Sequence, residues 1–369
     1  MVVWKKLDLL LDFEQPTPYL VKSTEYDDSY DVPVLTAGQS LLLGYTNETK
    51  GIYQASKENP TIIFDDFTTS FHWIDFAFKV KSSAMKMLRP KEGVNFRYVY
   101  YSMCGINFVP GGHQRHWISK YSQFQIPIPS LSEQNRIVGI LDTFTDSIEN
   151  LKQQIAQRRK QYEHYRDKLL DLEGKEGVEM KEIQDICNNI CSGGTPSTSN
   201  REYYEGNIPW LRTQEVNWNE IFDTDIKITT EAVEHSSAVL IPVNCVIVAM
   251  YGATAAKTAI NKIALTTNQA CCNLDIDSNK ALYKYVFYWF CKEYLNLKSM
   301  GEGSQNNING KKIKTYPIQI PSLQEQQRIV SILDTFEASI SNLEAQLEQR
   351  QKQYEYYRNK LLSFEKEEH

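Results

Sequence analysis

The chain has 369 residues, two to three times the length of a typical single domain, so at least two folded units are expected. Its composition, with 41% hydrophobic, 12% aromatic and 23% charged residues, is that of a globular protein and excludes a disordered chain. The net charge of −6 argues against a general nucleic-acid binder, because such proteins are basic as a rule.

Cysteine usage and hydropathy bear on the compartment. The 7 cysteines form an odd set without regular spacing, which predicts reduced thiols in the cytoplasm. No apolar run approaches the roughly 18 residues needed to span a bilayer. The first residues also lack the small-residue cleavage site of a signal peptide. We therefore expect a cytoplasmic protein that makes no membrane contact.

A long internal repeat predicts the architecture. Residues 126–170 recur as residues 318–362, with about 31 of 45 positions identical. The offset of about 192 residues is too long for a solenoid repeat, so it indicates a duplicated unit made of a domain and a helix. Apolar residues in both copies follow alternating steps of three and four, which predicts two coiled-coil helices, each about 60 Å long.

The order of the segments predicts how the two helices pair. The linker after the first helix, residues 173–177, is short, so the second globular region begins at the far end of that helix. The second helix starts from the same region and pairs with the first only by running back along it. We therefore expect an antiparallel coiled coil with pseudo-two-fold symmetry. Arg158 and Arg350 fall on its seam, either as snorkelling side chains on a solvated face or as polar groups that set the register or contact a partner.

Each helix follows a globular domain of predicted α+β fold. The predicted boundaries are 1–129 and 173–321 for the domains, and 130–172 and 322–369 for the helices. Short β-rich stretches alternate with polar turns, which indicates a mixed or antiparallel sheet, and each domain contains one late aromatic helix. The aromatic runs at 98–101 and 283–290 resemble stacking platforms, but core packing is the favoured interpretation.

Charge is distributed in the same order along both domains. Residues 79–120 hold eight Lys or Arg against one acid, and residues 280–314 hold seven against two. The front of the first domain, residues 1–75, holds five bases against twelve acids. A solvated face is the ordinary explanation for a basic run. Its recurrence at the matching place favours phosphate binding by two symmetric domains.

Catalytic motifs are missing from the sequence. It contains no phosphate-binding loop, dinucleotide fingerprint, nucleophile elbow, zinc-protease motif or amino-methyltransferase Asp/Asn-Pro-Pro-Tyr/Phe run. Cys187 and Cys191 have no second pair for a zinc site, and the Asp65-Asp66 pair fits a turn better than a metal site. We predict a non-catalytic chain that binds no metal or cofactor of its own.

The two copies of IPSLxEQxRIVxILDTF and QRxKQYExYRxKLL, together with GGTPS at 193–197, resemble the specificity subunit of type I restriction–modification systems over essentially the whole chain. The resemblance implies two target recognition domains, each reading one half of a bipartite double-stranded DNA site, with helix length setting the spacer. It also implies two modification subunits on the helices, which carry S-adenosylmethionine and adenine-N6 methylation. Two restriction subunits with ATP and magnesium complete the complex. The first domain departs from the pattern, because residues 13–19 stand where the GxTPS motif is expected.

Candidate DNA contacts come from polar loops. Glycines permit close backbone approach, hydroxyls and lysines suit phosphates, and Arg and Gln suit guanine and adenine edges. For each residue alone, a structural role in a turn is an equal alternative. In the second domain the candidates are Gly193, Gly194, Thr195, Ser197, Arg212, Thr213, Gln214, Tyr251, Lys257, Thr258, Ser304, Gln305, Asn306, Lys311 and Lys312. In the first domain they are Thr36, Gln39, His113, Gln114, Arg115 and His116.

Two other functional classes compete with DNA recognition. A coiled-coil scaffold with two protein-binding domains explains the acidity but not the matched basic segments. A single-chain nuclease or methyltransferase is disfavoured by the missing motifs.

Overall fold

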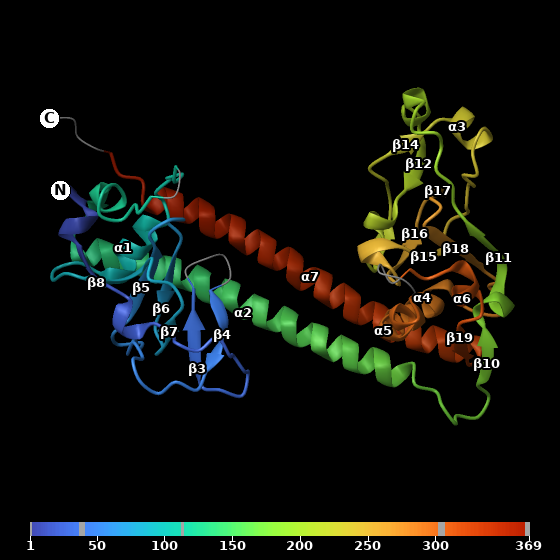
Figure 1. Cartoon of the computed structure of the whole chain (residues 1–369), viewed down its shortest axis with the longest axis horizontal. Helices are drawn as coiled ribbons and strands as arrows, with labels where there is room; N and C mark the ends of the chain where they lie inside the picture. Colours follow the sequence, from blue (N-terminus) through green and yellow to red (C-terminus); the bar gives the residue numbers. More distant parts are fainter. Residues whose placement is uncertain (1, 37–40, 112–113, 302–306, 366–369) are drawn as a thin grey trace. The chain divides into compact units, whose positions relative to one another are not determined.

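The computed structural model describes residues 2–36, 41–111, 114–301 and 307–365, and it divides into two compact units (Figure 1). The first unit comprises residues 1–152 and 346–369, and the second comprises residues 153–345. Each unit contains one globular domain and a portion of both long helices, α2 (Leu131–Leu169) and α7 (Leu323–Leu361). The boundaries predicted from the sequence for the four segments stay predictions.

Both long helices begin in the same way. The hydroxyls of Ser130 and Ser322 each accept a hydrogen bond, 3.3 Å long, from the backbone N–H three residues later. These serines follow a proline in each copy, and a serine that satisfies a free N–H group at a helix start is a strong initiation signal. Both helices span 39 residues, so the repeat in sequence is a repeat in structure.

The two helices pair in an antiparallel sense within each unit. In the first unit Phe144 of α2 stacks on Tyr357 of α7, with ring centroids 5.3 Å apart. In the second unit Tyr165 of α2 stacks on Phe336 of α7 at 5.4 Å. The earlier α2 residue meets the later α7 residue, so the predicted antiparallel pairing is confirmed.

The two arginines on the seam lie over these same rings. The guanidinium carbon of Arg350 is 5.7 Å from the centroid of Phe144, and that of Arg158 is 6.0 Å from the centroid of Phe336. Each arginine therefore contacts an aromatic ring of the opposing helix, a favourable cation–π geometry. This contact favours the register-setting interpretation over a freely snorkelling side chain.

The first globular domain is built on three sheets. A four-stranded antiparallel sheet has the order β2-β8-β5-β6, a three-stranded sheet has the order β4-β3-β7, and β1 pairs with β9. One helix, α1 (Phe96–Met103), packs in its core. The strands are β1 (Val3–Lys6), β2 (Leu11–Glu14), β3 (Val32–Leu35), β4 (Leu42–Thr46), β5 (Thr61–Asp65), β6 (Phe71–Ile74), β7 (Lys79–Val80), β8 (Met85–Pro90) and β9 (Gln125–Ile128).

The second globular domain repeats this plan with an extra strand. Its largest sheet has the order β11-β18-β15-β16-β13, a three-stranded sheet has the order β14-β12-β17, and β10 pairs with β19. The helices are α3 (Thr230–Glu234), α4 (Tyr283–Lys292), α5 (Tyr294–Ser299) and α6 (Gly310–Lys314). The strands are β10 (Glu179–Glu182), β11 (Cys187–Ser192), β12 (Ile208–Leu211), β13 (Asn219–Ile221), β14 (Lys227–Ile228), β15 (Val246–Ala249), β16 (Thr258–Asn261), β17 (Thr266–Thr267), β18 (Cys271–Ile276) and β19 (Pro317–Ile320).

The small sheets show that the domains are copies. Strand β3 pairs antiparallel with β4 and parallel with β7. Strand β12 pairs in the same two ways with β14 and β17. The α+β fold class, with mixed sheets and an internal repeat, is therefore confirmed.

The aromatic runs are core elements. Tyr98 and Tyr101 of α1, and Tyr285 and Tyr288 of α4, are fully or almost fully buried. The core-packing interpretation of these runs is confirmed, and no tyrosine of this group is available to stack on a ligand.

All seven cysteines are free thiols, in agreement with the sequence prediction. Burial raises the pKa of Cys245 and of Cys272 to about 12, so these thiols stay protonated at neutral pH.

Candidate nucleic-acid interface

Two of the predicted loops lie together in the second unit. The turn that follows β12, at Thr213–Glu215, contacts the turn that follows β15, at Gly252–Thr254. Gln214 and Tyr251 are exposed, and Thr213 is half-buried. The sheet therefore brings an amide, a phenol and a hydroxyl to one surface, and such groups hydrogen-bond to bases and phosphates.

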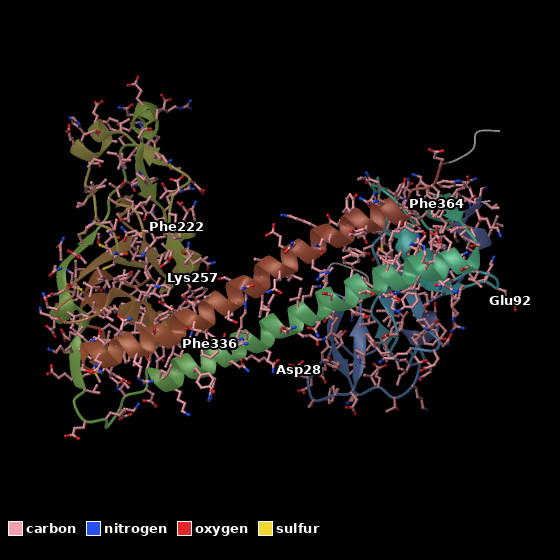
Figure 2. The ribbon with its side chains drawn as sticks, turned by 180° about the vertical axis from the view of Figure 1, so that it is seen from behind. Asp28, Glu92, Phe222, Lys257, Phe336 and Phe364 are labelled. Carbon is pink, nitrogen blue, oxygen red and sulfur yellow. The ribbon has the colours of Figure 1, made fainter. Side chains whose placement is uncertain are left out.

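Lys257 completes this surface with a positive charge. Its Nζ donates to Asn217 Oδ1 at 2.7 Å and lies 4.5 Å from the ring centroid of Trp218. Among the described residues it has no carboxylate partner, so its charge is not neutralised. Lys257 lies in the same unit as the helix residue Phe336 (Figure 2).

Trp218 belongs to this surface, although the sequence interpretation missed it. Its side chain is 40% exposed, its backbone has the positive φ of 53°, and its ring meets Tyr294 edge-on at 5.1 Å. A left-handed backbone is uncommon outside glycine, and such positions cluster at functional sites. The signal in the sequence is a tryptophan flanked by two asparagines, where core packing is not expected.

Arg212 is held by its own domain. Its guanidinium lies 3.4 Å from Asp225 and 3.7 Å from Glu215. When the Gln214 side-chain amide is oriented with its oxygen toward the guanidinium, that oxygen accepts hydrogen bonds from Arg212 at 3.0 Å. An arginine that reads a guanine must exchange these partners, so its contribution to DNA binding depends on releasing Asp225.

The sequence analysis explained the glycines of the loop at 193–197 by close backbone approach to DNA, and the structure gives another reason for them. Gly193 and Gly194 are buried, and a Cβ atom would lie 2.0 Å from the Thr267 carbonyl oxygen at Gly193 and 2.3 Å from the Ala238 backbone nitrogen at Gly194. The protein's own backbone is therefore sufficient to explain why glycine is required at both positions. In the same loop Thr195 is exposed and bonded to Gln269, and Ser197 is exposed beside Ser199.

Two further candidates are buried and cannot touch DNA in this conformation. Thr258 lies in β16, between β15 and β13, and is fully buried. His116 is also fully buried, and its backbone N–H donates to the Asp66 carbonyl oxygen at 2.8 Å. In the first unit Gln114 and Arg115 are exposed, and Thr36 is half-buried with its N–H donated to the Leu41 carbonyl oxygen. Gln39, His113, Ser304, Gln305 and Asn306 lie outside the described residues.

The two candidate lysines of α6 differ. Lys311 is exposed, whereas the Nζ of Lys312 donates to the Met300 carbonyl oxygen at 2.7 Å. Only the first of them presents a free ammonium group to a ligand.

Part of the first basic segment is structural. Lys79 and Lys86 are only 2% and 1% exposed, and they pair with Glu48 and Asp66 at 3.2 Å each. Their charges are neutralised inside the domain, so these two lysines do not contribute to phosphate binding. The neighbouring Asp65 accepts the N–H groups of two following residues at 2.8 Å each and so begins a turn.

Hydrogen bonds at the joint between each domain and its helix are repeated at equivalent residues of the two units. In the first unit the Tyr98 hydroxyl donates to the Pro127 carbonyl oxygen at 2.8 Å, and the Gln134 amide oxygen accepts from the Asn95 N–H at 3.0 Å. The equivalent bonds in the second unit join Tyr285 to Gln319 at 2.6 Å and the Leu282 N–H to Gln326 at 2.8 Å. Gln134 and Gln326 are 1% and 0% exposed, so each joint is anchored by one buried amide.

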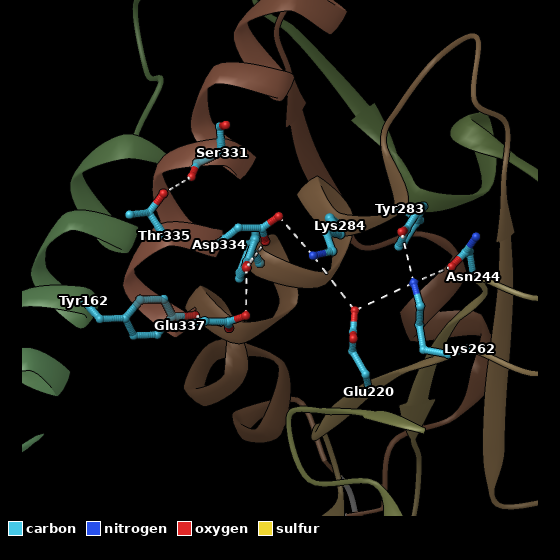
Figure 3. A network of polar contacts seen from close by, with 11 residues as sticks. Tyr162, Glu220, Asn244, Lys262, Tyr283, Lys284, Ser331, Asp334, Thr335 and Glu337 are labelled. Carbon is cyan, nitrogen blue, oxygen red and sulfur yellow. Dashed lines mark hydrogen bonds and ion pairs between the residues drawn. The ribbon is translucent and has the colours of Figure 1, made fainter. Parts of the chain in front are cut away.

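A second hydrogen bond between domain and helix is also found in both units, but the second unit has an additional ionisable group beside it. Tyr101 donates to Asp142 at 2.5 Å, and Tyr288 donates to the equivalent Asp334 at 2.6 Å. In the second unit the Tyr288 hydroxyl oxygen also lies 2.9 Å from Glu337 Oε2. Figure 3 shows Glu337 and Asp334 close together on α7. Burial raises the pKa of the Glu337 carboxyl group. The second joint therefore contains a carboxyl group whose ionisation is less favourable than in water.

The network of the second joint continues into the sheet. Lys284 of α4 lies 3.0 Å from Asp334 and 3.9 Å from Glu220, which in turn lies 3.8 Å from Lys262 (Figure 3). These contacts link α7, α4, strand β13 and the residue after β16, so they hold the domain to its part of the helix pair.

The comparisons with known proteins agree with this duplicated plan. A family profile described as the type I restriction modification DNA specificity domain matches residues 4–158 and again residues 175–351. The chain belongs to the type I restriction–modification DNA specificity family. The type I restriction enzyme EcoR124I/EcoR124II specificity subunit of Escherichia coli is 43% identical, covering 100% of this chain and 95% of that protein. A putative type I restriction enzyme specificity subunit of Haemophilus influenzae is 29% identical, covering 98% and 96%.

Solved structures share the fold of this chain. The S subunit of a type I restriction–modification system from M. genitalium has a TM-score of 0.66 at 15% identity and covers 99% of this chain and 97% of its own. A chain from a study of complex assembly and conformational transition of the type I system has a TM-score of 0.60 at 15% identity, covering 98% and 96%. Among the described residues of the present chain, no helix is both long and apolar enough to cross a membrane.

Proposed function

We propose that the chain is the non-catalytic DNA sequence-specificity subunit of a cytoplasmic type I restriction–modification complex, which methylates adenine at N6. Each globular domain reads one half of a bipartite target in double-stranded DNA. The 43% identity to a type I specificity subunit over the full chain supports this assignment.

The duplicated joint supports the proposal that the two globular domains read DNA in equivalent ways. In each unit one buried glutamine and one tyrosine, Tyr101 or Tyr288, bond the domain to its part of the helix pair. A second tyrosine bonds to the strand that precedes the helix. The matching strands β3 and β12 have the same kind of antiparallel neighbour in the two domains. Two matched readers fit a target made of two half-sites.

The helices and the partners divide the remaining tasks. In the proposed complex, α2 and α7 set the spacer between the half-sites and dock two modification subunits, which bind S-adenosylmethionine. Two restriction subunits bind ATP and magnesium. The role of this chain's own residues is to position DNA and to select its sequence.

The charge of the chain predicts that tight DNA binding requires the partner subunits. The net charge is −6, and several cations of the basic segments are neutralised by carboxylates of their own unit. Phosphate neutralisation supplies much of the affinity of DNA-binding proteins. We therefore expect weak DNA binding by the isolated chain and strong binding when modification subunits are present.

A binding experiment tests the proposal against the scaffold alternative. The chain is purified with its modification partner, and the affinity for target DNA is compared with that for the same fragment with either half-site scrambled. Recognition predicts a loss of affinity of about 10³-fold or more for each scrambled fragment, as for other specific DNA-binding proteins. Equal affinity for all fragments, with partner binding that does not depend on salt, would support the scaffold.

A further inference from the structure

Two cavities lined by described residues of the second unit differ in their electrostatic character. The larger one, of about 950 Å³, is lined by four cations, and each has a carboxylate within ion-pair distance. The pairs are Arg159 with Glu344, Arg166 with Asp167, Lys284 with Asp334, and Lys292 with Glu293. This cavity is neutralised by its own walls, so an anionic ligand gains little by entering it.

The smaller cavity, of about 530 Å³, is positively charged. Its lining includes Lys311 and Lys314 of α6 and Ser192 at the end of β11, and it contains no carboxylate. In the described part of the chain neither lysine has an ion-pair partner. Two like charges that lack a counter-ion are stabilised by an anion placed between them.

The sequence of α6 explains why these two lysines face one side. Residues three apart share a helix face, so Lys311 and Lys314 lie together. Ile313 is fully buried and fixes the turn against the domain core, and Lys312 is turned away to the Met300 carbonyl oxygen at 2.7 Å. The sequence alone favoured Lys311 with Lys312, whereas the structure pairs Lys311 with Lys314.

The hydroxyl groups that line the smaller cavity are also suited to an anionic ligand. The Thr315 hydroxyl already donates its proton to the Lys311 carbonyl oxygen at 3.1 Å. Ser192 is exposed and precedes the glycine-rich loop at 193–197. Its hydroxyl is therefore the donor that an oxyanion between the two lysines would meet.

We propose that the cavity of Lys311, Lys314 and Ser192 binds a phosphate group. The inference that this phosphate belongs to the DNA backbone rests on the proposed function. A free phosphate or a nucleotide offers the same chemistry, and the experiment below distinguishes the two sources. In either case the site positions a ligand and does not read bases.

The test compares two variants with matched chemistry. The double variant Lys311→Gln/Lys314→Gln removes both positive charges from the cavity. The control variant Lys312→Gln removes a lysine of the same helix whose side chain does not line the cavity. Each full chain, in complex with its modification partner, is titrated with target DNA at several salt concentrations. The loss of one phosphate contact is expected to reduce the slope of log affinity against log salt by about 0.9, and to weaken binding about 8-fold at 0.1 M salt. Lys312→Gln is expected to keep the original slope.

A second arm uses inorganic phosphate as the probe. Binding to the full chain is measured by ³¹P NMR line broadening for the original sequence and both variants, and urea unfolding verifies that the variants are folded. A reduced salt slope in the double variant supports a DNA phosphate. An unchanged slope, with phosphate binding lost only in the double variant, supports a free phosphate group.

The proposal is overturned if the double variant matches Lys312→Gln in both arms. That outcome is distinct from failure of the proposed function, which would show as equal affinity of the unaltered complex for target and scrambled DNA.

Discussion

The buried ion pair of Lys86 and Asp66 makes a quantitative prediction about the first domain. The Nζ and Oδ2 atoms are 3.2 Å apart, and the side chains are 1% and 2% exposed. The other carboxylate oxygen of Asp66 accepts the Trp117 N–H at 2.7 Å. Lys86→Met removes the positive charge, fills similar volume and leaves an uncompensated carboxylate in the core.

The expected cost is large. Removing one partner of a buried ion pair costs about 3–5 kcal/mol, a large part of the 5–15 kcal/mol that stabilises a typical domain. The double variant Lys86→Met/Asp66→Asn removes the buried charge and keeps an oxygen for Trp117, so it should recover most of the loss. Lys91→Met is the control, because Lys91 and its partner Asp12 are 38% and 71% exposed, and such pairs contribute less than about 1 kcal/mol.

Native-state hydrogen exchange of the β5 and β8 amides measures this cost in the first unit alone, since urea unfolding of a chain with two units combines two transitions. Lys86→Met should lower the protection free energy by about 3–5 kcal/mol, and Lys91→Met by less than about 1 kcal/mol. A cost for Lys86→Met below about 1 kcal/mol would refute the structural role of this pair. A double variant no more stable than the single one would refute it equally.

Three further predictions concern the second unit. Because burial raises the pKa of Glu337, ionising this carboxyl group costs more in the folded state than in the unfolded chain. Glu337→Gln should therefore raise the hydrogen-exchange protection free energy of the α4 amides at pH 7, a gain that disappears as the pH falls below the ordinary pKa of glutamate, and equal protection at pH 7 would contradict it. Lys257→Gln should reduce the salt slope of DNA affinity by about 1 for all sequences alike, whereas Lys227→Gln, whose lysine pairs with Asp223 at 3.1 Å, should not. Gly194→Ala should destabilise the unit by about 2 kcal/mol or more, because the new Cβ would clash with backbone atoms at 2.3 Å; unchanged hydrogen-exchange protection of the β15 and β18 amides would argue against that packing.

The architecture could be predicted from the sequence because its signals are local or repeated. The alternating steps of three and four fix each helix, and the repeat with its short linker predicts antiparallel pairing. The contacts of Phe144 with Tyr357 and of Tyr165 with Phe336 bear this out. The buried tyrosines of α1 and α4 follow from the same amphipathic pattern.

Individual site residues were harder to predict because tertiary pairing decides their exposure. Thr258 follows a polar loop in sequence but lies in a strand with neighbours on both sides. Lys86 adds to a basic segment, yet its partner Asp66 lies 20 positions earlier in the chain and buries its charge. Trp218 carried no basic or glycine motif, and only its exposure and its backbone conformation single it out.

Methylation of a randomised DNA library tests the central claim most directly. The complex with the modification partner is assayed with the unaltered chain, with Gln114→Ala in the first unit and with Gln214→Ala in the second. Sequencing of the methylated molecules should yield two short motifs separated by a fixed gap, and each variant should relax only one motif, a different one in each case. A single continuous motif, or relaxation of both motifs by one variant, would contradict the reading of two half-sites by two domains.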